Sequence, residues 1–151
     1  MRDGDPQTWM TDVDDSRIDA LRKVPLFAGL ADAELEALPE QAEERSYRTG
    51  QDLVTQGDSS GPFFLLYEGR CQVTVDGHPR RKVGPGQYFG DMALIDGEPR
   101  SATVRAETDV RGLAIHAEAF FGILESNFGV ARKIMANLSR RARAAERQLH
   151  E

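Results

Sequence analysis

One acidic and one basic side chain lie close together in a segment rich in small and apolar residues. The segment reads FGDMALIDGEPRSATVRA over residues 89–106, with Asp91 and Arg100 nine positions apart. A guanidinium is a planar fork of donors that suits a phosphate, whereas an ionised carboxylate only accepts hydrogen bonds. The two residues therefore suit a ligand that carries both a phosphate and a hydroxyl group, as a ribose phosphate does.

The residues between the pair add further donors. The run DMALI is long enough for one helical turn, and the unpaired N–H groups at the start of such a turn favour an anion. Ser101 adds a hydroxyl next to Arg100. A salt bridge between Asp91 and Arg100 that braces a loop is the other interpretation, and spacing alone slightly favours it.

Composition limits the classes of protein to which the chain can belong. Its 151 residues are 40% hydrophobic and 29% charged, as in a single soluble globular domain. No apolar run approaches the roughly 20 residues of a membrane helix, so no membrane segment is expected. The single cysteine, Cys71, and the absence of a signal peptide pattern favour a cytoplasmic location. A net charge of −6 argues against DNA binding over the whole surface.

Two short helices are expected before the middle of the chain. Residues 1–15 are acidic and are predicted to be a disordered tail. A helical lead-in follows over residues 16–40: Ser16 can cap a first helix, and Asp32 can cap a second that ends near Pro39.

The middle of the chain, residues 43–115, has strand character. Short stretches of alternating hydrophobicity are separated by turns that contain glycine. Many short strands at this spacing predict a sandwich or a small barrel that is mainly β, with helices on either side. The alternation turns five side chains inward, with Cys71 as a small core residue and not a nucleophile: Cys71, Val73, Val75, Ala102 and Val104.

Helices return over residues 117–150. The longer of them carries an apolar stripe made of Val130, Ile134, Leu138, Ala142, Ala145 and Leu149. Arginines occupy its other faces, and they are solvated unless they meet the acidic N-terminal end or an acidic partner. The stripe covers the barrel or pairs with a second copy of itself. We expect a homodimer through Val130, Ile134, Leu138 and Ala142.

The segment GQYFGDMALIDGEPRSATVRA resembles the phosphate-binding cassette of the cyclic nucleotide-binding domains. This family includes bacterial cAMP-receptor regulators, regulatory subunits of protein kinase A and cyclic nucleotide-gated channels. Its pattern runs Phe-Gly-Glu, a small apolar turn, and Arg-(Ser/Thr/Ala)-Ala. The matching residues are Phe89, Gly90, Ala93, Leu94, Pro99, Arg100, Ser101, Ala102, Thr103 and Val104. The likeness extends over about residues 18–149, with a lead-in like that of the bacterial branch, and implies that residues 16–151 form one such domain, an antiparallel jelly-roll barrel.

The resemblance also implies roles for single residues. Arg100 would pair with the cyclic phosphate, and Ser101 with the N–H groups of Met92 and Ala93 would bind its oxygens. Asp91, after Gly90, would accept the ribose 2′-hydroxyl. Further contacts with the sugar or the base are assigned to Leu66, Val83 and Glu146.

Two departures from the family pattern affect the expected function. The family has glutamate where this chain has Asp91, whose side chain is shorter by about 1.5 Å of reach. The chain also ends at Glu151, where the regulators continue into a DNA-binding region, so no DNA binding is expected of it.

Three functions remain open at this point. The favoured one is a non-enzymatic sensor of cAMP or cGMP, without cofactor or metal, that signals to an unknown protein partner through its C-terminal helix. The alternative is a degenerate domain that acts as a ligand-independent dimerisation or docking module. An enzyme or a DNA-binding regulator is the third, disfavoured because no catalytic or metal-ligand motif is present.

Overall fold

The computed structural model describes residues 17–59 and 61–150. They fall into two compact units, one of Glu40–Phe121 and one that combines the residues up to Pro39 with those from Gly122 onward. The first is called the sheet unit and the second the helical unit. The predicted disordered tail, residues 1–15, lies outside the described residues.

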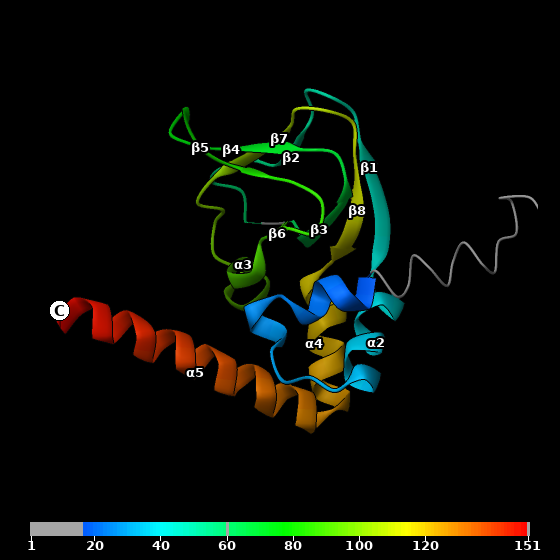
Figure 1. The fold of residues 1–151 in the computed structure, drawn as a ribbon, viewed down its shortest axis with the longest axis vertical. Helices are drawn as coiled ribbons and strands as arrows, with labels where there is room; N and C mark the ends of the chain where they lie inside the picture. Colours follow the sequence, from blue (N-terminus) through cyan, green and yellow to red (C-terminus); the bar gives the residue numbers. More distant parts are fainter. Residues whose placement is uncertain (1–16, 60, 151) are drawn as a thin grey trace, which may run out of the picture. The chain divides into compact units, whose positions relative to one another are not determined.

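The sheet unit contains short strands and one short helix (Figure 1). The helix, α3 (Asp91–Asp96), lies between the sixth and seventh strands in the chain. The strands are β1 (Glu43–Tyr47), β2 (Asp52–Val54), β3 (Phe63–Glu68), β4 (Cys71–Val75), β5 (His78–Val83), β6 (Tyr88–Phe89), β7 (Thr103–Ala106) and β8 (Val110–Ile115).

These strands form two four-stranded sheets, with the orders β1-β8-β3-β6 and β2-β7-β4-β5. All pairings in both sheets are antiparallel. The prediction of a mainly β protein with flanking helices is therefore confirmed. The closed barrel is not, because the strand pairings of the described residues stay within each sheet and none joins the two.

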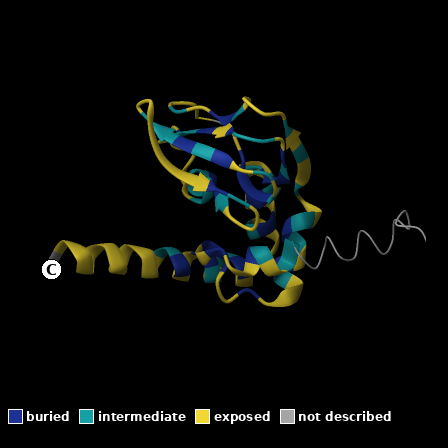
Figure 2. Ribbon diagram, turned by 45° about the horizontal axis from the view of Figure 1, so that its top comes forward, coloured by how far each residue is buried: buried dark blue, intermediate teal, exposed yellow. Residues whose placement is uncertain are grey.

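Apolar side chains from both sheets form one core, seen as the buried parts of the strands in Figure 2. Phe64 lies within it, with its ring centroid 5.8 Å from those of Tyr47 and Phe89. Cys71, Val73 and Val104 are buried, as alternation predicts. Val75 and Ala102 are half-buried, which reflects their position beside a cavity described below.

The helical unit packs short N-terminal helices against a long C-terminal one. Residues 17–22 are helical, and η1 (Pro25–Phe27) and α2 (Asp32–Glu40) follow. The border between the units falls inside α4 (Ala117–Ser126), and α5 (Phe128–His150) comes next. Asn127 caps α5, because its side-chain oxygen accepts a 3.2 Å hydrogen bond from the N–H of Val130.

Polar contacts within the helical unit hold the first half of α5. The buried amide of Asn137 donates to the carbonyl oxygens of Leu26 and Ala28, at 2.8 and 2.9 Å. The ammonium of Lys133 donates a 2.7 Å hydrogen bond to the carboxylate of Glu34. These contacts tie α5 to η1 and to the start of α2.

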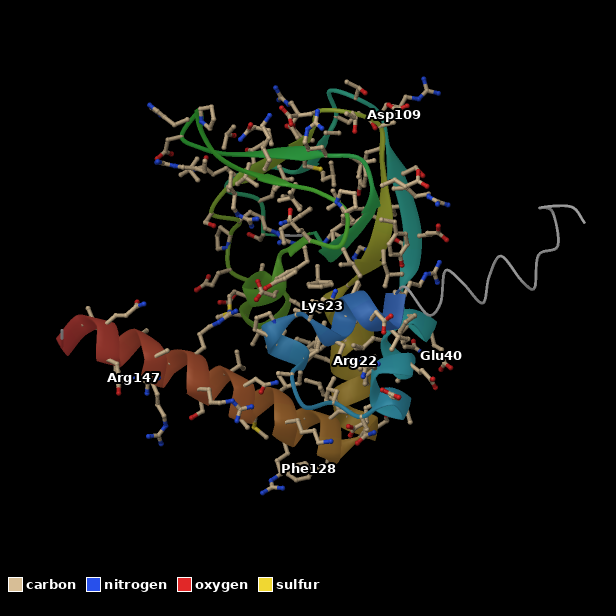
Figure 3. All side chains as sticks on the ribbon, viewed as in Figure 1. Arg22, Lys23, Glu40, Asp109, Phe128 and Arg147 are labelled. Atoms are coloured by element: carbon tan, nitrogen blue, oxygen red, sulfur yellow. The ribbon has the colours of Figure 1, made fainter. Side chains whose placement is uncertain are left out.

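The second half of α5 has a different environment. Every residue from 141 to 149 is exposed, and Leu149 is 84% exposed (Figure 2). Phe128 at the start of the helix and Arg147 near its end also project from the ribbon, as the labels in Figure 3 show. Only Val130 and Ile134 of the predicted apolar stripe are buried, so the later part of the stripe is uncovered in the described chain.

Within the described residues, none of the helices has the length and apolar character needed to cross a bilayer.

Candidate functional site

A cavity of about 520 Å³ lies in the sheet unit, between strands of the β2-β7-β4-β5 sheet, α3 and the loop after α3. Its volume is in the range typical of small-molecule sites. The residues that line it include six that the sequence singled out: Gly90, Asp91, Met92, Ala93, Arg100 and Ser101. The structure therefore brings the predicted phosphate and ribose residues to one hollow.

Arg100 is the buried charge of this cavity. Its side chain is only 7% exposed, and its Nη2 donates a 2.7 Å hydrogen bond to the carbonyl oxygen of Pro62. No carboxylate of the described residues forms an ion pair with it. Burial lowers the pKa of the Arg100 guanidinium, although arginine stays protonated in proteins. A buried cation without a counter-ion is costly, so an anion entering the cavity would be strongly favoured.

Backbone hydrogen bonds fix the position of Arg100. Its N–H donates to the carbonyl oxygen of Asp58 at 2.7 Å, and its carbonyl oxygen accepts from the N–H of Gly57 at 2.9 Å. The backbone of Arg100 is thereby held against the turn at residues 57–58. The guanidinium contacts Pro62, which follows that turn a few residues later in the chain.

Two glycines make room for the guanidinium. A Cβ on Gly90 would stand 2.5 Å from Nη1 of Arg100 and 2.9 Å from the carbonyl oxygen of Pro62. A Cβ on Gly61 would stand 3.1 Å from Nη2. Gly90 also has φ +89°, which side-chain-bearing residues rarely adopt. The Gly of the predicted motif is therefore needed for both backbone conformation and space.

Gly90 leads directly into α3. The helix is one to two turns long, and the N–H of Leu94 donates to the carbonyl oxygen of Gly90 at 3.0 Å. Gly97 ends the helix in the left-handed conformation, and its N–H donates a 2.9 Å hydrogen bond to the carbonyl oxygen of Ala93. Leu94 is the buried anchor, while Met92 is 42% exposed at the cavity. The short helix thus presents its first turn beside Arg100.

The alternative of a salt bridge between Asp91 and Arg100 is not what the structure contains. The guanidinium donates to Pro62 instead, and Asp91 has interactions of its own. Both residues line the same cavity, with the carboxylate half-buried and the guanidinium buried. They share a site without neutralising each other.

Three predicted contact residues lie elsewhere. Leu66 and Val83 are fully buried in the core and are not among the residues that line the cavity. A ligand would reach them only if the strands moved. Glu146 lies on the exposed part of α5, in the helical unit, and does not line the cavity either.

Other charged residues at the cavity were missed from the sequence. Arg80 and Arg81 line it from β5, and Asp96 and Glu98 line it from α3 and the following loop. Strict alternation along β5 would place only one of the two arginines on the cavity side. The consecutive arginines in HPRRKV were the available signal.

Cys71 is chemically quiet in this structure. It is fully buried, and burial, with a smaller contribution from the Glu107 carboxylate, raises the pKa of its thiol to about 11. Almost no thiolate is present at neutral pH, and the thiolate is the nucleophile. Cys71 is therefore a core residue, as its place in the strand pattern predicts.

Comparisons with known proteins agree with this fold. The family model of the cyclic nucleotide-binding domain matches residues 44–127. A cyclic nucleotide-gated potassium channel of Rhizobium etli is 37% identical over 111 residues, which are 74% of this chain and 31% of the channel. The cyclic AMP receptor protein of Thermus thermophilus is 33% identical over 130 residues, 83% of this chain and 60% of the receptor.

Solved structures show the same likeness. The N-terminal domain of a transcriptional regulator from Streptomyces coelicolor superposes with a TM-score of 0.80 at 28% identity, covering 87% of this chain and 95% of that one. The regulatory domain of Toxoplasma gondii protein kinase A, crystallised with cAMP, gives 0.67 at 25% identity over 74% of this chain and 44% of that one. The chain belongs to the cyclic nucleotide-binding domain family. It spans about a third of the matched channel and three fifths of the matched receptor.

Proposed function

We propose that this chain is a sensor domain that binds a cyclic nucleotide, cAMP or cGMP, in the cavity beside α3. The observation that carries the proposal is the buried guanidinium of Arg100, which faces the cavity without a carboxylate partner in the described residues. A cyclic phosphate supplies the single negative charge that this guanidinium lacks. The Toxoplasma relative crystallised with cAMP supports that choice of ligand.

The surrounding groups complete the proposed phosphate site. Ser101 and the N–H groups of Met92 and Ala93 would donate to the phosphate oxygens beside Arg100. These residues line the cavity together. Each charge-assisted hydrogen bond to the phosphate contributes roughly 1.5–3 kcal/mol when it is shielded from water.

Asp91 is assigned to the ribose 2′-hydroxyl. Aspartate is one methylene shorter than the glutamate of the family pattern, and a direct hydrogen bond tolerates only a few tenths of an ångström. The ribose contact is therefore the weak part of the site, either long or bridged by water. Leu66, Val83 and Glu146 keep only secondary roles, as proposed neighbours of the sugar and base after a rearrangement.

Signalling is assigned to the helices from Ala117 onward. A ligand shifts a conformational equilibrium only through its unequal affinity for the two states. We propose that occupancy of the site by phosphate changes the packing of α4 and α5, and that an unidentified protein partner responds. Amide exchange over residues 117–149 should change when ligand is added. Binding with no change there would leave a receptor without this switch.

The same proposal covers architecture and assembly. Residues 16–151 are taken as one non-catalytic cytoplasmic domain of bacterial type, with its two sheets parts of a jelly roll. A homodimer through α5 stays part of it, with one correction. Val130 and Ile134 are already buried, so the interface would use the half-buried Leu138 and the exposed positions after it, Ala142 among them. Leu138→Glu should then lower the solution mass to that of a monomer.

Titration calorimetry with cAMP and cGMP tests the central claim. We expect binding of at least one of them, and its loss in Arg100→Ala. This chain has Asp91 where the family pattern has glutamate, and that difference favours a second candidate function, a docking module that no longer binds nucleotide. If neither the natural chain nor Asp91→Glu binds at millimolar concentration, that second function replaces the first.

A further inference from the structure

Two consecutive arginines of β5 line the same cavity, although successive side chains of a regular strand point to opposite faces. The register of β4 with β5 explains how. Val73 pairs with Arg81, whereas Thr74 pairs with Pro79, so Arg80 is an extra residue in the strand. A bulge of this kind re-aims a side chain. It brings Arg80 to the cavity beside Arg81.

Arginines on other strands of the two sheets behave differently. Arg45 pairs with Glu43, Arg105 with Asp52 and Arg111 with Glu44 and Glu68. Lys82, the next residue of β5, pairs with Glu107 and does not line the cavity. In the described chain, the guanidinium groups of Arg80 and Arg81 form neither an ion pair nor a side-chain hydrogen bond.

Acidic side chains at the cavity do not occupy these arginines. Asp96 accepts a 2.9 Å hydrogen bond from the N–H of Glu98, and both residues line the cavity with Asp91. No ion pair connects any of the three to Arg80 or Arg81 in the described residues. The cavity therefore has two separate groups of phosphate donors, one at buried Arg100 and one at the bulge of β5.

We propose that Arg80 and Arg81 bind a second anionic group of the ligand, so that the preferred ligand is a nucleotide with two phosphates. Two adjacent planar forks of donors suit one phosphate, and both arginines line the same cavity as Arg100. Cyclic dinucleotides and nucleoside bisphosphates both have this chemistry. The inference rests on the proposed function, because it assigns the first phosphate to Arg100.

Calorimetry with matched ligands distinguishes these sources. The probes are cyclic di-AMP, adenosine 3′,5′-bisphosphate and cAMP, each repeated with its guanine counterpart. We expect a two-phosphate probe to bind at least tenfold more tightly than the cyclic mononucleotide with the same base. The two-phosphate probe that binds more tightly than its cyclic mononucleotide shows whether the site prefers a cyclic dinucleotide or a nucleoside bisphosphate. The gain should shrink as salt rises, because the arginines are exposed.

Variants test whether Arg80 and Arg81 cause the tighter binding of the two-phosphate probe. In Arg80→Gln/Arg81→Gln the two-phosphate probe should lose at least tenfold in affinity, while the cyclic mononucleotide changes by less than about twofold. Lys82→Gln is the matched control on the same strand and should change neither. A thermal melt equal to that of the natural chain shows that the double variant is folded.

Two results would overturn the inference, and they differ in what else they affect. If a cyclic mononucleotide binds at least as tightly as every two-phosphate probe, the second phosphate site is refuted and the proposed function stands. The same holds if the double variant changes no affinity. If no probe of either kind binds, the proposed function and this inference fail together.

Discussion

The guanidinium of Arg100 is held by the carbonyl oxygen of Pro62, 2.7 Å from its Nη2 and 38 residues earlier in the chain. A carbonyl oxygen orients the guanidinium without cancelling its charge, unlike a carboxylate. The remaining donors of the side chain keep their full positive potential at the cavity. The site is therefore preorganised for an anion, because the cost of burying and orienting the cation is met in folding.

Replacement of Arg100 tests this arrangement most directly. Arg100→Ala should weaken cyclic nucleotide binding at least tenfold, since a lost charge-assisted contact of roughly 1.5–3 kcal/mol exceeds the 1.4 kcal/mol of one decade. Arg100→Lys should recover only part of it, because lysine lacks the planar fork. Arg105→Ala removes an exposed arginine paired with Asp52 and serves as the calorimetric control. Equal losses in both alanine variants would contradict a specific role for Arg100.

Gly90→Ala should damage both stability and binding. The new methyl group would stand 2.5 Å from Nη1 of Arg100, and φ +89° is strained for alanine. We expect at least a tenfold loss of affinity and a loss of about 1–3 kcal/mol in the free energy of unfolding. Gly97→Ala is a matched control, because Gly97 has φ +67° but nothing within 4 Å of its Cβ position. Gly97→Ala should lower the stability of the protein but leave its affinity unchanged. Equal affinities of Gly90→Ala and Gly97→Ala would refute the steric explanation.

Asp91 should tolerate substitution better than Arg100. Because its reach to a ribose hydroxyl is short, Asp91→Ala should cost less than about threefold in cAMP affinity. Asp91→Glu should tighten binding by restoring the missing methylene. The comparison is made by calorimetry at fixed salt. Weaker binding by the glutamate variant would mean that the loop has already adjusted to aspartate, so that the longer side chain clashes.

Cys71 should resist alkylation in the folded protein. Its pKa of about 11 and its full burial leave little accessible thiolate at pH 7–8. Mass spectrometry after treatment with iodoacetamide should show no adduct under native conditions and complete reaction in denaturant. Labelling of the native chain within minutes at neutral pH would show that the core between the sheets opens readily.

The pair Glu34–Lys133 gives a pH dependence within the helical unit. The Lys133 ammonium, followed by the N–H of Ala31, lowers the pKa of the Glu34 carboxyl below its ordinary 4.5. A depressed carboxyl pKa stabilises the fold above pH 4.5, and this contribution is lost as the pH falls through the lower, folded-state value. Lys133→Met should cost less than about 1 kcal/mol at pH 7, because the lysine is partly exposed. In denaturant titrations the difference should shrink at pH 3, and a constant difference would exclude the pair as its cause.

Local features of the site were predictable from the sequence, whereas long-range ones were not. Gly90 and Arg100 belong to one short segment, so their order and spacing carry the motif. Pro62 accepts from Arg100 across 38 positions, and nothing local indicates that partner. Leu66 was assigned near the ligand by analogy, but its side chain belongs to the core.

The same distinction applies to the strands. Alternation in residues 71–75 predicts burial of Cys71 and Val73, because each side of a strand has one environment. It fails at Arg80, where an extra residue changes the register. The apolar stripe of α5 predicted either cover by the barrel or pairing with a second copy, and within the described chain packing reaches only as far as Leu138.

The close approach of Gly90 to Arg100 also links the evolutionary fates of the two positions. While the arginine is present, any side chain at position 90 collides with it, so selection for the cation enforces glycine. Once the arginine is replaced by a smaller residue, the nearest of these contacts disappears, although the carbonyl oxygen of Pro62, 2.9 Å from the same Cβ position, and the backbone conformation still favour glycine. Among descendants of this chain that no longer bind nucleotide, replacement of the arginine should therefore precede any replacement of Gly90. The order of the two replacements would then record when a lineage exchanged a small-molecule signal for another use of the fold.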